Sequence, residues 1–350
     1  MVIGRIPFIQ DGIANILAKA TNGLSVVLEH RYYGESMPTQ NLSTESLRFL
    51  TTEQAVADTA YFAEHVVFPG FENRQLMASN TPWIVYGGSY AGGFAVCIYI
   101  ILIRMYAQVS AGANYKFFKY PKALCRIKYP DIFWGAISSS GITEAFVEFW
   151  QFYEPMRLFG PQDCISTDQK LVNILDNIMI GRNDSVLTRR LKGLFGVADL
   201  SHDDDFAIMV ANGIAAWENL VWDPRADMDM FWEFCGNITV TDRLLYPQTA
   251  ALRETAEEMI VLGGWQHELQ TLINPMLNLV GYLNLTSVSP CIEKKQTIEQ
   301  CLGHYNVTCY QQDDIHQTWR TWPYQKCTQY VLFLFRFFLE MLILILITIR

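Results

Sequence analysis

The pentapeptide GGSYA at residues 87–91 has the spacing of a serine nucleophile held on a tight turn. A serine hydroxyl is a weak nucleophile at its ordinary pKa, and it reacts only where a neighbouring base assists it. In a nucleophile elbow the serine lies between a strand and a helix, and its small neighbours let the backbones approach closely. We therefore predict that Ser89 is the nucleophile of an acyl transfer and that the backbone N–H of Tyr90 donates to the oxyanion.

The sequence around this turn predicts the elements that must position it. Three apolar runs predict buried strands, at residues 24–28, 82–86 and 132–141. A helical apolar run begins at Phe94, directly after the turn, and residues 47–67 predict another helix with Thr51 or Thr52 as its N-cap. Strands that alternate with helices are typical of a parallel sheet covered by helices.

The pattern changes after residue 143. Four stretches have apolar residues at helical spacing, with Gly and Pro between them: residues 170–195, 206–221, 252–261 and 268–285. Residues 144–330 are therefore predicted to be mainly helical. Residues 331–349 are almost entirely apolar and long enough for a bilayer span, but Arg336 and Glu340 near the middle make insertion costly. A membrane anchor and a non-native tail both stay open as interpretations.

Composition excludes some classes of protein and favours one compartment. The chain has 350 residues, of which 51% are hydrophobic and 17% charged, so it is not a disordered protein. Its formal net charge of -9 argues against a general nucleic-acid binder. Eight cysteines and several Asn-x-Ser/Thr triplets favour a secretory, disulfide-forming origin, although the sequence leaves the pairing of the cysteines open. The triplets predict glycosylation at Asn41, Asn183, Asn237, Asn284 and Asn306.

Several motifs resemble, in order, the prolyl carboxypeptidase and dipeptidyl-peptidase II family of serine peptidases. They are EHRYYGESMP at residues 29–38, LRFLTTEQA at 47–55, the turn at 87–91, YPDIFWGAISSSG at 129–141 and WPYQKCT at 322–328. The resemblance implies an α/β-hydrolase core interrupted by a helical cap domain, with a Ser-Asp-His triad. It also implies exopeptidase action on peptides with a Pro-type penultimate residue, in a secreted, vacuolar or lysosomal location. No cofactor and no metal are expected.

The chain departs from the family pattern in three places. Residues 1–23 are too short to supply the opening strands and the glycine-rich oxyanion loop, and they contain no signal peptide. Ser89 and Tyr129 are 40 positions apart, so we interpret residues 97–124 as a non-family insertion from a retained intron or a wrongly assigned exon. Gln329 stands where the family has an acidic residue, and the apolar tail follows it.

These departures remove the expected proton acceptor. The triad Asp and His of the family follow the motif at residues 322–328, and neither has a counterpart in this chain. We assign a structural role to His30, and the later histidines all lie in the cap-like region: His202, His267, His304 and His316. Because a triad that lacks members leaves at most residual catalysis, we predict that this chain is nearly inactive.

The predicted organisation has three parts. Residues 1–143 form an incomplete α/β-hydrolase core, residues 144–330 a helical cap domain, and residues 331–350 a hydrophobic tail. Two alternative functions stay open. One is an esterase on the same fold, and the other is a non-catalytic, membrane-tethered binding protein.

Overall fold

The computed structural model describes residues 12–73, 76–95, 125–139, 141, 150–220, 230–316 and 320–330. The chain divides into two compact units, the first comprising residues 1–146 and 307–332, the second 147–306 and 333–350. The predicted insertion (97–124) and the predicted tail (331–350) lie outside the described residues. Within the described ranges, no helix combines the length and apolar character needed to cross a bilayer.

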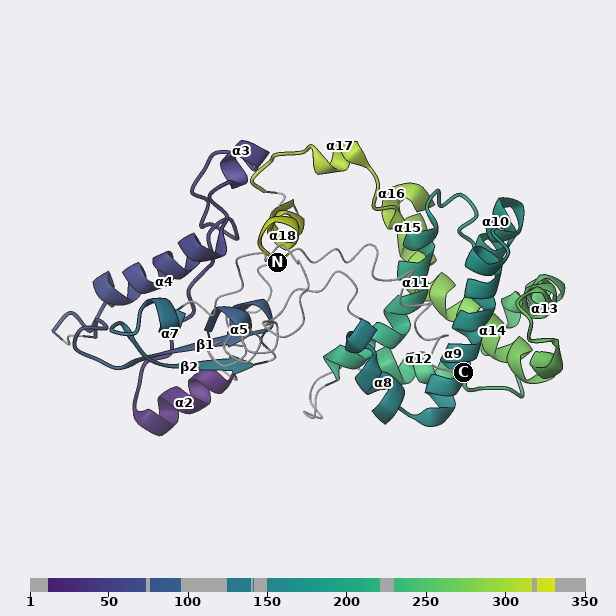
Figure 1. Ribbon diagram of the computed structural model, residues 1–350, viewed down its shortest axis with the longest axis horizontal. Helices are drawn as coiled ribbons and strands as arrows, with labels where there is room; N and C mark the ends of the chain where they lie inside the picture. Colours follow the sequence, from purple (N-terminus) through teal and green to yellow (C-terminus); the bar gives the residue numbers. More distant parts are fainter. Residues whose placement is uncertain are drawn as a thin grey trace, which may run out of the picture. The chain divides into compact units, whose positions relative to one another are not determined.

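In its described part, the first unit contains two strands. Helices accompany them, as labelled in Figure 1. In chain order its elements are α2 (Ile13–Thr21), α3 (Thr44–Leu47), α4 (Thr52–His65), β1 (Trp83–Gly88), α5 (Tyr90–Ala95), α7 (Cys125–Lys128), β2 (Phe133–Ser139), α17 (Val307–Tyr310), α18 (Thr321–Gln325) and η8 (Lys326–Tyr330). The strands β1 and β2 pair in parallel, with Tyr86 opposite Ile137. This pairing agrees with the prediction of a parallel sheet made from residues 82–86 and 132–141.

The helix α4 begins where the sequence predicts. The hydroxyl of Thr51 accepts a hydrogen bond from the backbone N–H of Gln54, at 3.2 Å, and so caps the helix. Its buried face contributes small side chains such as Ala60 to a cluster that includes Phe133 of β2 and the partly buried Trp83 of β1. The helix therefore covers one face of the two strands.

The prediction of a strand at residues 24–28 is wrong. No strand forms there, and the side chains of Leu24 and Leu28 are 49% and 41% exposed. A strand needs a neighbour that satisfies its backbone N–H and C=O groups. Among the described residues, β1 pairs only with β2, so this apolar segment has no strand to join.

The segment from residue 307 to 330 groups with the first unit, whereas the sequence predicts it to be part of the helical domain. The backbone N–H of Leu42 donates to the carbonyl of Asp313 at 2.7 Å. Ile315 and Tyr324 pack against the buried Tyr32. These contacts join chain segments more than 270 positions apart, so helical spacing alone could not assign the segment to a domain.

The second unit is helical throughout its described part. Its elements are η1 (Trp150–Phe152), α8 (Glu154–Phe159), α9 (Gln162–Asp176), η2 (Asn177–Gly181), α10 (Ser185–Leu194), α11 (Asp203–Ala215), η3 (Ala216–Asn219), α12 (Met230–Ile238), η4 (Pro247–Leu252), α13 (Arg253–Leu262), η5 (Gln266–Glu268), α14 (Leu269–Leu283), η6 (Asn284–Val288), α15 (Ser289–Glu293) and α16 (Ile298–Leu302). The nearly all-buried α14 packs against α9, α12 and α13 (Figure 1). The single helix predicted over 170–195 is in fact α9, η2 and α10 in succession.

Two disulfides reinforce this unit. Cys164 of α9 is bonded to Cys235 of α12, and Cys291 is bonded to Cys301, ten positions later. The bonds agree with the disulfide-forming origin predicted from composition. Because the first bond joins elements 71 positions apart, it also fixes how α9 and α12 pack.

The five glycosylation triplets lie in different surroundings. Asn41, Asn183 and Asn306 are exposed. Asn237 is only 6% exposed, and its Nδ2 donates to the carbonyl of Glu233 at 2.8 Å within α12. Asn284 is half-buried, and its Nδ2 donates to a helical carbonyl at 3.0 Å. A glycan is attached through this nitrogen, so the fold leaves room for it at three of the five positions.

We therefore expect three glycans on chain expressed through a secretory route. Replacing Asn41, Asn183 or Asn306 by Gln should each remove the mass of one glycan, as read by intact mass spectrometry before and after glycosidase treatment. The matched control, Asn237→Gln, should leave the glycan mass unchanged. A glycan found on Asn237 would contradict the packing of α12.

Candidate active site

Ser89 lies at the turn between β1 and α5, where the sequence predicts it. Its φ is 54°, in the left-handed region that residues other than glycine rarely adopt, and its side chain is exposed. A strand that ends at Gly88 and a helix that begins at Tyr90 leave one residue to reverse the chain direction. The geometry is that of a nucleophile elbow, which presents a side chain above the carboxyl end of a strand.

Close backbone approach explains the small residues on either side of Ser89. A Cβ atom added to Gly87 would lie 1.9 Å from the carbonyl oxygen of Ala91. One added to Gly92 would lie 2.7 Å from the carbonyl oxygen of Ser139, at the end of β2. Any larger residue at these two positions would push the helix away from the strands, so the turn requires both glycines.

Hydrogen bonds fasten the turn to β2. The backbone N–H of Ser89 donates to the carbonyl of Ser139 at 2.8 Å, and the hydroxyl of Ser138 donates to the carbonyl of Gly92 at 2.8 Å. The turn also closes on itself, because the N–H of Gly92 donates to the carbonyl of Ser89 at 2.9 Å. Strand β2 therefore holds in place the turn that carries the exposed Ser89 side chain.

The side chain of Tyr90 lies among residues from two distant parts of the first unit. Its ring meets Trp322 edge-on at 5.6 Å and His30 at 5.9 Å between centroids. Nε2 of Gln325 donates to its hydroxyl at 2.9 Å, and the same hydroxyl lies 3.4 Å from Nε2 of His30. The phenol of Tyr33 donates in turn to the side-chain oxygen of Gln325.

Burial sets the protonation of this cluster. It lowers the pKa of His30, mainly by desolvation, so the imidazole is neutral near pH 7. It raises the pKa of Tyr33 to about 12, again mainly by desolvation. His30 Nδ1 lies 2.7 Å from the carbonyl oxygen of Arg31. The second ring nitrogen, Nε2, lies near the Tyr90 hydroxyl, and the structural role assigned to His30 stays a prediction.

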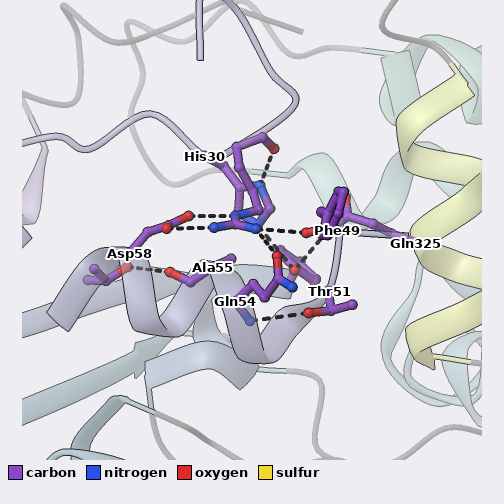
Figure 2. A network of polar contacts seen from close by, with 10 residues as sticks. His30, Phe49, Thr51, Gln54, Ala55, Asp58 and Gln325 are labelled. Carbon is purple, nitrogen blue, oxygen red and sulfur yellow. Dashed lines mark hydrogen bonds and ion pairs between the residues drawn. The ribbon is translucent and has the colours of Figure 1, made fainter. Parts of the chain in front are cut away.

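Arg31 ties the loop at residues 29–38 to α4, and Figure 2 labels its partners Asp58, Gln54 and Phe49. Its Nε and Nη2 donate to the two oxygens of Asp58, both at 2.6 Å. Nη1 donates to the carbonyl of Phe49 at 2.8 Å and also to the side-chain oxygen of Gln54. Bidentate pairing of this kind fixes an arginine in one orientation. The adjacent His30 is therefore placed by α4.

Among the residues that the structure describes, none is placed as a general base for Ser89. Within the described ranges, no histidine or carboxylate side chain hydrogen-bonds to its hydroxyl. In the second unit, Nδ1 of His304 lies 2.7 Å from Oδ1 of the buried Asp205, and His202 stacks on Tyr305 at 3.7 Å. The remaining later histidines, His267 and His316, are exposed.

Sequence reasoning missed the partners of Tyr90. Gln325 and Trp322 belong to the WPYQKCT motif, which the family resemblance marked without giving any of its residues a role. Tyr33 likewise lies in the EHRYYGESMP motif at residues 29–38. The resemblance identified these segments one by one, but only the folded chain joins them around one phenol.

A family profile described as "Serine carboxypeptidase S28" matches residues 7–101, which include the turn at Ser89. The chain is 46% identical over 327 residues to a protein of Arthroderma benhamiae named "Probable extracellular serine carboxypeptidase". It is 25% identical over 348 residues to "Serine protease vicPa" of Bipolaris victoriae, and 27% identical over 203 residues to "Thymus-specific serine protease" of Mus musculus.

The extent of these matches is asymmetric. The alignment covers 93% of this chain but 42% of the Arthroderma benhamiae protein. The corresponding shares are 94% and 55% for the Bipolaris victoriae protein, and 56% and 34% for the mouse protein. The chain therefore spans about half, or less, of the length of these relatives.

Proposed function

This chain is by family a serine-type peptidase, related to the serine carboxypeptidases described as S28, and on that premise we propose that Ser89 is its nucleophile. The hydroxyl oxygen attacks the carbonyl carbon of a peptide bond and forms an acyl-enzyme, while the amine leaves with a proton. The backbone N–H of Tyr90 donates to the oxyanion of the tetrahedral intermediate. Water then hydrolyses the ester and releases the acid.

One observation carries this assignment. Ser89 has a φ of 54° at the junction of β1 and α5, and its side chain is exposed. A non-glycine residue in the left-handed region costs about 1–3 kcal/mol, and residues strained in this way cluster at active sites. Tyr90, as the residue after the nucleophile, occupies the position whose N–H completes the oxyanion hole in such elbows.

The proposed substrate class rests on the resemblance to the prolyl carboxypeptidase and dipeptidyl-peptidase II family. We propose peptides with a Pro-type penultimate residue and an exopeptidase reaction, in an incomplete α/β-hydrolase core with a helical cap. We also propose a secreted, vacuolar or lysosomal location; the name of the Arthroderma benhamiae relative, which calls it extracellular, supports secretion. The comparisons lend no support to the esterase or to the membrane-tethered binding protein.

We further propose that the 350-residue polypeptide by itself hydrolyses peptides very slowly. Among the described residues, no histidine or carboxylate side chain hydrogen-bonds to the hydroxyl of Ser89. Without its base, a serine stays protonated and attacks poorly. The elbow and its oxyanion donor would then supply only residual catalysis.

Labelling by a serine-directed phosphonate tests both proposals. The 350-residue chain should label slowly, and Ser89→Ala should abolish the adduct, as seen by mass spectrometry of the peptide containing residue 89. Ser166→Ala, which removes an exposed serine of α9 in the second unit, is the control and should retain the slow adduct. An adduct that persists in Ser89→Ala would refute the assignment of Ser89 as the nucleophile. Rapid labelling that depends on Ser89 would instead refute the claim that the chain is slow.

A further inference from the structure

Tyr90 is held by a residue that lies 235 positions later in the chain. We propose that Gln325 is a positioning residue for the turn at Ser89 and that it acts through the phenol of Tyr90, without touching the substrate. The proposal rests on the assignment of Ser89 and the Tyr90 N–H as reacting groups. It deepens that assignment by naming what holds the oxyanion donor in place.

The hydrogen bonds around Tyr90 run in one direction. A carbonyl can only accept, so the contact of 2.7 Å between His30 Nδ1 and the carbonyl of Arg31 places the ring proton on Nδ1. Nε2 of the neutral ring is then an acceptor for the Tyr90 hydroxyl, 3.4 Å away. The oxygen of Tyr90 accepts from Gln325 at 2.9 Å, and Gln325 accepts from Tyr33.

These hydrogen bonds form a relay that runs from Tyr33 through Gln325 and Tyr90 to His30. Each member of the relay is oriented by its neighbour. Gln325 is fully buried, and both ends of its amide are used, the nitrogen as donor to Tyr90 and the oxygen as acceptor from Tyr33. Thr321, which is also fully buried and one turn earlier in α18, hydrogen-bonds through its side chain to Tyr33. Polar groups in such surroundings are costly to leave unpaired, so the relay specifies one arrangement.

The turn needs such support from two sides. The left-handed backbone at Ser89 persists only where the surrounding structure determines it. On one side, β2 accepts the N–H of Ser89 through the carbonyl of Ser139 at 2.8 Å. On the other side, Gln325 fixes the phenol of Tyr90 while its ring lies edge-on to Trp322. Loss of the second support should let the Tyr90 backbone move.

Amide hydrogen exchange measures this support without any reaction at Ser89. In the 350-residue chain, Gln325→Met replaces the amide by an apolar side chain of similar length. It should speed exchange in the peptide covering residues 86–92 by about tenfold or more, because two hydrogen bonds are lost. Tyr90→Phe removes one hydroxyl and should speed the same exchange severalfold. Gln329→Met is the matched control, since Gln329 accepts from the N–H of Thr52 instead.

The outcomes separate the proposal from its alternatives. Exchange of residues 86–92 that is unchanged in Gln325→Met, with α4 still protected, would overturn the positioning role. If Gln325→Met unfolds α4, the Tyr90→Phe variant provides the test instead. Exchange of residues 86–92 that is unchanged in Tyr90→Phe would then overturn the positioning role of Gln325. If Gln329→Met speeds exchange at the turn as much as Gln325→Met does, the effect is a general loosening of α18 and η8. That result would also refute the proposal. Failure of phosphonate labelling at Ser89 would leave the exchange result standing.

Discussion

Removing the disulfide between Cys164 and Cys235 is expected to lower the free energy of unfolding of the second unit by about 4 kcal/mol. The bond closes a loop of 71 positions, so it restricts the unfolded chain strongly. It also joins α9 to α12 within the core of this unit. The double variant Cys164→Ala/Cys235→Ala should show the loss as a lower urea midpoint of the transition that reports on these helices.

The second disulfide provides the internal comparison. Cys291 and Cys301 are ten positions apart, and the shorter loop predicts a smaller loss of about 2.5–3 kcal/mol for Cys291→Ala/Cys301→Ala. The order of the two effects is the sharper test, because both variants replace two half-cystines by alanine. Equal losses, or a larger loss for the shorter loop, would mean that native packing rather than chain entropy dominates.

The second unit is expected to lose stability as the pH rises from about 4 to about 8. Burial raises the pKa of Asp168 to about 7 and that of Asp176 to about 8, from 3.8. Both carboxyls lie on α9, and neither oxygen of Asp176 has a hydrogen-bond partner. Because desolvation favours the neutral acid, the folded unit keeps these protons after the unfolded chain has lost them.

The sign follows from proton binding. Between the unfolded and folded pKa values, the unfolded state binds fewer protons than the folded one, so stability falls with rising pH. The slope approaches about 1.4 kcal/mol per pH unit for each carboxyl. The stabilisation is complete below pH 4 and is lost as the pH passes 7 for Asp168 and 8 for Asp176.

Asp176→Asn isolates one carboxyl. The amide imitates the protonated acid, so the variant should lose part of the pH dependence and should gain stability relative to the natural chain at pH 8. Urea unfolding at pH 5 and pH 8 measures both effects. Asp199→Asn is the matched control, since Asp199 is in the same unit with its side chain 83% exposed. A pH dependence that is unchanged in Asp176→Asn would show that this carboxyl is solvated in the folded chain.

Local signals in the sequence were sufficient for the turn that carries the proposed nucleophile. An apolar run, a set of small residues and a helical run occur within about fifteen positions, and together they predict β1, the turn at Ser89 and α5. Each of these signals depends only on neighbours in the chain. The cap at Thr51 followed from the same kind of pattern.

The same signals misassigned a strand. Residues 24–28 are as apolar as β1, yet they form no strand and stay exposed. Whether an apolar run becomes a strand depends on a partner for its backbone, and that partner is not visible in the run itself. The break of the predicted helix over 170–195 into α9, η2 and α10 has a similar cause, since hydrophobic spacing continues across the turn near Asn183.

By itself, the sequence determined where the exposed serine would lie, which family it resembles and that cysteines would pair. Only the tertiary structure decided that Gln325 would meet Tyr90, that Cys164 would pair with Cys235 and that residues 307–330 would join the first unit. The physical reason is range. Strands, turns and caps are determined by neighbours a few positions away, whereas buried polar contacts depend on which distant segments the core brings together.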